Sequence, residues 1–174
     1  MTDSVNLDGI PAEEVDGFLA YRAKVAGTNI SAQTLLATDY LNHFNEIIML
    51  LEMVPDMPDC LDEAKEWQPK GYQDHFRDST FSDKELAIEA YAHVPSKFRR
   101  PFEDILAQMN QNVFETIDRL QKIIDEENGH EEMLKDAARM GSRNVQLLMD
   151  RASAVIHGSD RAMDQSEIDG MLNG

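Results

Sequence analysis

The sequence predicts an all-α protein: an antiparallel helical bundle of five or six helices with a short C-terminal recognition helix. Apolar residues recur at helical spacing over several long stretches of the 174-residue chain. The composition includes ten Met and only 7% aromatic residues, which favours helices over sheets. No shift in composition demands a second domain. We therefore expect one bundle over residues 11–158.

The first two helices follow from their boundary residues. Pro11 suits a first helical turn, and Gly27 ends the apolar pattern that follows it. Ser31 suits the N-cap of the second helix, whose apolar residues continue at helical spacing until Pro55. We expect this second helix, over about 31–54, to be substantially buried.

The middle of the chain carries a weaker helical pattern. Prolines and Gly71 interrupt residues 55–81, which predicts a crossover with one short helix across DCLDEAKEW. Trp67, Tyr72 and Phe76 are the expected anchors of this crossover. Ser82 and Glu85 then have capping-box spacing at the start of a helix that Pro95 closes.

Two long helices are expected after the crossover. The first opens near Pro101 and ends at the Asn128-Gly129 pair, because both residues tolerate the left-handed conformation of a helix C-terminus. The second runs from about Glu131 to His157, with Gly158 as its stop. Each carries one apolar stripe, and the connection is short. This arrangement predicts an antiparallel helical hairpin.

Charge and cysteine content restrict the class of protein. Sixteen basic and 33 acidic residues give a formal net charge of −17. Such a field repels phosphate backbones and anionic lipids, so we expect neither a nucleic-acid nor a membrane partner. Cys60 is the only cysteine, the N-terminus lacks the pattern of a signal peptide, and no apolar run approaches the ~20 residues of a membrane span. We expect a cytoplasmic protein.

The last twelve residues, MDQSEIDGMLNG, have the pattern of a short amphipathic helix. Ile168, Met171 and Leu172 share one helical face, and Asp164 and Glu167 have capping-box spacing. An isolated helix below ~12–15 residues is marginal in water, so either the parent bundle or another protein must cover this apolar face. We therefore divide the chain into a flexible N-terminus (1–10), a bundle (11–158), and a linker with a C-terminal docking peptide (159–174).

The end of this segment, QSEIDGMLNG, resembles the SQ-x-EIDALLNG peptide by which the flagellar switch protein FliM binds the phosphorylated response regulator CheY. The resemblance covers about ten of the 174 residues and does not reach the helical body. Gly170 and Met171 replace an Ala-Leu pair, and the glycine weakens a helix by roughly 1 kcal/mol. A related peptide ends the phosphatase CheZ. The matching residues are Gln165, Glu167, Ile168, Asp169, Leu172, Asn173 and Gly174.

The resemblance implies a bacterial protein of chemotaxis or motility signalling whose partner is a CheY-like receiver domain. The body would be an adaptor or regulator rather than an enzyme, and it could form a homo-oligomer. The residues themselves predict no cofactor and no metal. The residues expected to bind the receiver are Gln165, Glu167, Ile168, Asp169, Met171 and Leu172.

Two alternatives stay open for the body. A CheZ-like phosphatase would present an acid and an amide from one helix face, and Asp39, Asn42 and Asn45 are the candidates, although the QD-x-x-GQ arrangement of CheZ is absent. These residues also fit a simple polar stripe on a core helix. A metal-binding bundle would use Glu-x-x-His pairs, of which Glu127 to His130 is one, interrupted by the Asn-Gly stop.

Overall fold

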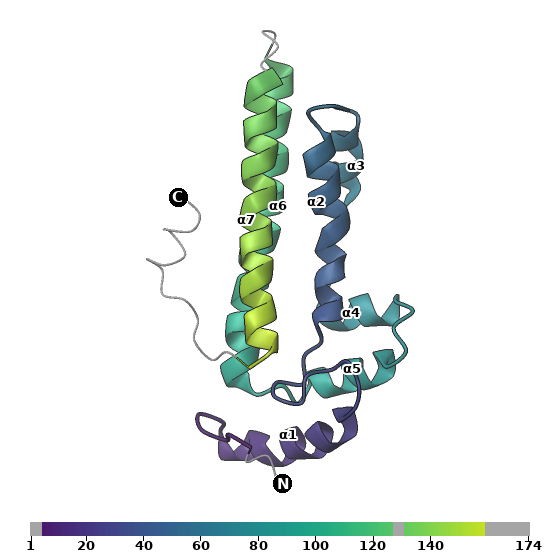
Figure 1. The fold of residues 1–174 in the computed structure, drawn as a ribbon, viewed down its shortest axis with the longest axis vertical. Helices are drawn as coiled ribbons and strands as arrows, with labels where there is room; N and C mark the ends of the chain where they lie inside the picture. Colours follow the sequence, from purple (N-terminus) through teal and green to yellow (C-terminus); the bar gives the residue numbers. More distant parts are fainter. Residues whose placement is uncertain (1–4, 127–130, 159–174) are drawn as a thin grey trace. The chain divides into compact units, whose positions relative to one another are not determined.

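The computed structural model describes residues 5–126 and 131–158. In these ranges the chain has seven α-helices, one 3-10 helix and no strand, which confirms the predicted all-α class. No helix in the same ranges is long and apolar enough to cross a membrane. The predicted recognition helix lies outside the described residues. The elements, drawn in Figure 1, are α1 (Ala12–Val25), η1 (Thr38–Asn42), α2 (His43–Met53), α3 (Cys60–Glu66), α4 (Tyr72–Arg77), α5 (Lys84–Tyr91), α6 (Ser96–Asp125) and α7 (Glu131–Ile156).

Contacts between residues divide the chain into two compact units, each assembled from distant segments. Among the described residues, unit 1 contains 5–40, 70–104 and 151–158, and unit 2 contains 41–69, 105–126 and 131–150. The two long helices α6 and α7 contribute residues to both. The division into a flexible N-terminus, one bundle over 11–158 and a docking peptide stays a prediction.

Unit 1 is held together by aromatic side chains and by hydrogen bonds between distant segments. Tyr72 and Phe76 of α4 are buried, and the ring of Tyr72 stacks on Tyr91 of α5 with centroids 4.6 Å apart. The Tyr72 hydroxyl accepts a hydrogen bond from the backbone N–H of Ala37 at 2.8 Å. These contacts place the predicted anchors Tyr72 and Phe76 in a core.

Unit 2 contains α2 and α3 together with residues 105–125 of α6 and residues 131–150 of α7. These parts of α6 and α7 run antiparallel, which confirms the predicted hairpin (Figure 1). Gly141 faces Thr116 so closely that a Cβ built at Gly141 would lie 2.3 Å from the Thr116 methyl carbon. The third predicted anchor, Trp67, is 8% exposed, and its ring stacks on that of His43 with centroids 4.9 Å apart.

The predicted start of the second helix is wrong. The α-helix begins at His43, not near Ser31, and Leu35 has a left-handed φ of 70° that a right-handed α-helix cannot accommodate. The physical reason is the side chain of Thr34. Its hydroxyl donates to the carbonyl of Ile156 and accepts from the N–H of Leu36, which stabilises a turn. The expected burial is nevertheless confirmed, since Leu35 and Leu36 are fully buried.

Three smaller differences concern one whole helix and two helix starts. Helix α4 is not predicted by the sequence, and α5 begins at Lys84 without a side-chain cap, so the Ser82 capping box does not form. Helix α6 begins at Ser96, five residues before Pro101. The ends at Gly27 and Gly158 are confirmed, with φ of 81° and 104°. The Asn128-Gly129 stop lies outside the described residues.

Candidate functional site

A polar network joins α2 to α7 within unit 2. The Glu52 carboxylate accepts hydrogen bonds from the Ser142 hydroxyl and, at 3.2 Å, from the Gln146 amide nitrogen. The same amide nitrogen lies 2.9 Å from the Ser142 oxygen. Ser142 is 2% exposed, whereas Glu52 and Gln146 lie at the surface. The network therefore holds an acid and an amide side by side. The side-chain carbonyl oxygen of Gln146 accepts no hydrogen bond from the described residues.

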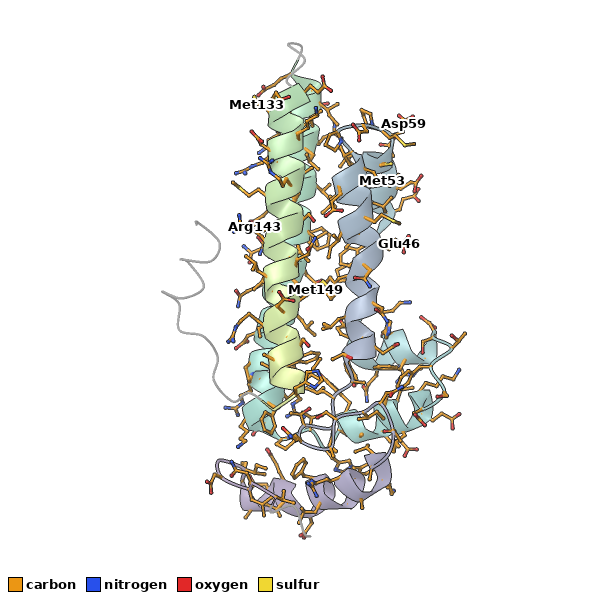
Figure 2. The ribbon with its side chains drawn as sticks, viewed as in Figure 1. Glu46, Met53, Asp59, Met133, Arg143 and Met149 are labelled. Carbon is orange, nitrogen blue, oxygen red and sulfur yellow. The ribbon has the colours of Figure 1, made fainter. Side chains whose placement is uncertain are left out.

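These side chains form one wall of an open groove of about 460 Å³ between α2 and α7, called here the α2–α7 groove. Lys135, Arg139 and Arg143 also line it. Because residues four apart lie one above another on a helix, these three cations form a continuous line along α7, called here the basic ridge. Arg143, on α7, is labelled in Figure 2.

The basic ridge is only partly neutralised by carboxylates on α7. Lys135 lies 3.7 Å from Glu131 and 3.8 Å from Glu132, and Arg139 lies 2.8 Å from Asp136. These three pairs are exposed, so each contributes about 0–1 kcal/mol and exchanges readily with another acid. Arg143 is exposed and has no ion pair with any described residue. The groove can therefore bind an anionic group through Arg143 without breaking a strong pair.

A second open groove, of about 600 Å³, lies between α6 and α7 in unit 2. Its apolar lining includes Ile123 and Ala137, with Met133 and Met140 exposed at 48% and 51%. Arg119 and Lys122 also line it, together with several carboxylates. Methionine is the most adaptable apolar side chain, and exposed methionines are frequent on surfaces that bind other proteins. Among the described residues, the exposed methionines all belong to unit 2: Met49, Met53, Met57, Met133 and Met140. Figure 2 labels Met53 and Met133.

No protein-family model, curated protein or solved structure matches the chain. The functional interpretation therefore depends on the residues themselves.

The structure holds the predicted candidates Asp39, Asn42 and Asn45 in two separate pairings. In unit 1, an Asp39 carboxylate oxygen lies 3.2 Å from Nε2 of His75 on α4. In unit 2, the Asn45 amide nitrogen donates to the Asn42 side-chain oxygen at 3.1 Å. Asp39 is thus engaged by an imidazole, and the two amides by each other. A different acid and amide lie together in unit 2, at Glu52 and Gln146.

Two other groups of predicted residues cannot be placed. The receiver-binding residues Gln165, Glu167, Ile168, Asp169, Met171 and Leu172 lie outside the described residues, as does the Glu127–His130 pair. In ranges 5–126 and 131–158, no three His, Cys, Asp or Glu side chains gather in a way that could hold a metal ion.

Sequence reasoning missed the basic ridge, although its four-residue spacing is visible in the sequence. It could not find the Glu52–Gln146 pair, because 94 residues separate the two side chains and only the packing of α2 on α7 brings them together.

Proposed function

We propose that this protein is a helical adaptor or regulator that acts in the bacterial cytoplasm and docks through its C-terminal peptide on a CheY-like receiver domain, in chemotaxis or motility signalling. The observation that supports the proposal is the agreement of seven residues of QSEIDGMLNG with a receiver-binding peptide. In this proposal Ile168, Met171 and Leu172 fill an apolar groove on the receiver. Glu167 and Asp169 meet basic residues at its rim.

The described body supports the proposal by offering further surface for protein contacts. Unit 2 carries two open grooves and five exposed methionines, a pattern that suits a protein partner better than a small substrate. The body would hold a second partner, or a second copy of the chain, while the C-terminal peptide holds the receiver.

The proposal is tested by titrating the full chain against a receiver domain with and without a beryllofluoride phosphoryl mimic. Ile168→Ala and Leu172→Ala each remove a buried anchor and should weaken binding roughly tenfold or more, since an anchor contributes about 2 kcal/mol or more. Ser166→Ala is the matched control, because Ser166 stands at the variable position of the peptide. Its affinity should equal that of the parent chain.

Two outcomes contradict the proposal. If no receiver binds the full chain or the free peptide in either state, the C-terminal segment is not a receiver ligand. If Ile168→Ala instead lowers the melting temperature of the body and leaves receiver affinity unchanged, the segment is a structural part of the bundle.

A second candidate function is hydrolysis of the receiver's aspartyl phosphate, and the Glu52–Ser142–Gln146 network favours it. The side-chain carbonyl oxygen of Gln146 would orient a water molecule, and Glu52 would accept a proton from that water. The water oxygen attacks phosphorus, the bond from phosphorus to the aspartate oxygen breaks, and inorganic phosphate and the free carboxylate result. Arg143 would bind the phosphoryl oxygens.

Measuring the decay of receiver phosphate separates the two candidates. A phosphatase accelerates the decay, and Gln146→Ala should reduce that acceleration by roughly a hundredfold. Gln111→Ala is the matched control, because Gln111 is an exposed glutamine on α6 whose side chain bonds, among the described residues, only to Glu115 one turn on. A decay rate that the parent chain leaves unchanged excludes hydrolysis and leaves the adaptor function.

A further inference from the structure

The α2–α7 groove carries a line of positive charge on a protein whose formal net charge is −17. Three cations of the basic ridge line this groove together with two carboxylates, Glu52 and Asp56. Glu52 already accepts hydrogen bonds from Ser142 and Gln146. On α7, Lys135 and Arg139 also form exposed ion pairs, which are weak, and Arg143 forms no ion pair with any described residue. Arg139 and Arg143 are therefore the cations that an acidic ligand can bind.

The chain itself supplies an acidic segment directly after the helix that carries the ridge. Residues 159–174 contain four acids and one arginine. Three of the acids, Asp164, Glu167 and Asp169, fall within six residues, and the apolar Ile168 lies between the last two. The groove offers Pro55 and Ala138 as apolar lining beside its cations. The segment thus complements the groove in both charge and apolar character.

The chain that follows α7 is long enough to bring these acids back to the ridge. Arg143 and Arg139 lie thirteen and seventeen residues before Ile156, which corresponds to about 20 and 26 Å along α7. Asp164 and Glu167 lie eight and eleven residues after Ile156, which allows an extended reach of about 27 and 37 Å. A segment that runs back along α7 can therefore place Asp164 near Arg143 and Glu167 near Arg139.

We propose that residues 164–172 dock in cis on the basic ridge, in the α2–α7 groove, and that this contact competes with receiver binding. The cis contact goes beyond the proposed function, and only the competition rests on it. A short tether gives an effective concentration on the order of millimolar, so a contact of millimolar affinity is about half occupied. Occupancy between about one half and nine tenths lowers receiver affinity roughly twofold to tenfold relative to the free peptide.

The cis contact is tested on the full chain by double electron–electron resonance. Spin labels are placed at Ser166→Cys in the segment and at Asp150→Cys, which is exposed and lies seven residues beyond Arg143 on the same side of α7. Cys60→Ala removes the buried native thiol in every chain compared. At low salt we expect a population with a short, narrow distance. A broad distribution alone, unchanged by salt, would overturn the proposal.

Charge reversal provides the decisive comparison. Arg139→Glu with Arg143→Glu should abolish the short distance, and adding Asp164→Arg with Glu167→Arg should restore it. Arg119→Glu with Lys122→Glu is the matched control, since it makes the same charge change in the other groove and should leave the short distance intact. If Arg139→Glu with Arg143→Glu unfolds the chain, Arg139→Gln with Arg143→Gln repeats the test with a smaller change of charge. A short distance that survives loss of both arginines would refute the assignment.

Two further measurements separate the possible failures. Mixing singly labelled chains should give no distance, and a distance there would show that the segment docks on a second copy. The receiver should bind the free peptide roughly twofold to tenfold more tightly than the full chain, and Arg139→Glu with Arg143→Glu should remove that difference. If the receiver binds neither, the proposed function fails while the resonance result still decides the cis contact. If it binds both equally and the distances are broad, the cis contact fails and the proposed function stands.

Discussion

Gly141 tests whether α6 and α7 are packed as closely as the structure shows. A Cβ added at this position would lie 2.3 Å from Cγ2, 2.4 Å from Oγ1 and 2.9 Å from Cβ of Thr116. Optimal carbon contacts are ~3.5–4.0 Å, so all three atoms overlap with the new methyl group. Rotation of the Thr116 side chain relieves two of these overlaps but cannot move its Cβ, and the Thr116 hydroxyl is also bonded to the carbonyl of Asn112 at 2.7 Å.

The two effects of Gly141→Ala oppose each other. Alanine is favoured over glycine in a helix by about 1 kcal/mol. Overpacking between the helices costs about 1–3 kcal/mol or more, because α6 and α7 must separate where Val113, Leu120 and Val145 are fully buried. With overlap at three atoms we take the upper part of that range, and expect a net loss of roughly 1–2 kcal/mol. For a chain of this size the melting temperature should fall by about 2–8 °C.

The assay is urea and thermal unfolding followed by circular dichroism. Gly71→Ala is the matched control, since nothing lies within 4 Å of a Cβ built there and its φ of −67° suits alanine; we expect it to cost under about 1 kcal/mol. Thr116→Ala combined with Gly141→Ala should be less destabilised than the sum of the single changes, because two overlapping atoms are gone. A higher melting temperature for Gly141→Ala, as helix propensity alone predicts, would refute the close packing.

Two further predictions concern unit 1. Glu14 of α1 accepts hydrogen bonds from the backbone N–H and the hydroxyl of Ser96 at 2.8 and 3.1 Å, so it caps α6. Glu14→Ala should therefore lower the free energy of unfolding in urea by about 1 kcal/mol. Glu13 is exposed, and Glu13→Ala should leave that free energy unchanged. Burial raises the pKa of Tyr40 to about 12, so the folded chain holds this proton more tightly and the resulting stability, complete below pH ~10, is lost as pH rises towards 12. Between pH 9 and 11.5 the parent chain should lose about 2 kcal/mol more than Tyr40→Phe in urea titrations, and equal losses would contradict the raised pKa.

Helices whose stops are local were predictable from the sequence, and those that depend on distant partners were not. Gly27 and Gly158 end α1 and α7 by adopting positive φ, a property of glycine itself. The start of α6 at Ser96 depends on Glu14, 82 residues earlier. The turn before α2 likewise depends on Thr34, whose hydroxyl binds a carbonyl 122 residues away. Periodicity cannot report either interaction.

The features of the candidate site were likewise predictable only where they depend on residues close in the sequence. The spacing of Lys135, Arg139 and Arg143 is a local property of α7, and the peptide resemblance is a property of ten consecutive residues. The pairing of Glu52 with Gln146 belongs to tertiary packing. Asp39 shows the converse: its helical spacing to nearby amides suggested a shared face, but the start of α2 at His43 leaves Asp39 in the 3-10 helix, beside His75.

The adaptor and phosphatase functions predict different results when residues 159–174 are removed. If the body only holds a second partner, removing this segment abolishes receiver recognition and leaves the rate of phosphate decay unchanged. If Glu52 and Gln146 hydrolyse the phosphoryl group, a segment docked on Arg139 and Arg143 covers the groove where that reaction occurs. A chain ending at Gly158 should then show a raised KM, because the tether is lost, together with a kcat at least equal to that of the full chain, because the groove is open. A kcat that falls with the segment removed would place the segment in the reaction itself, which the cis contact forbids.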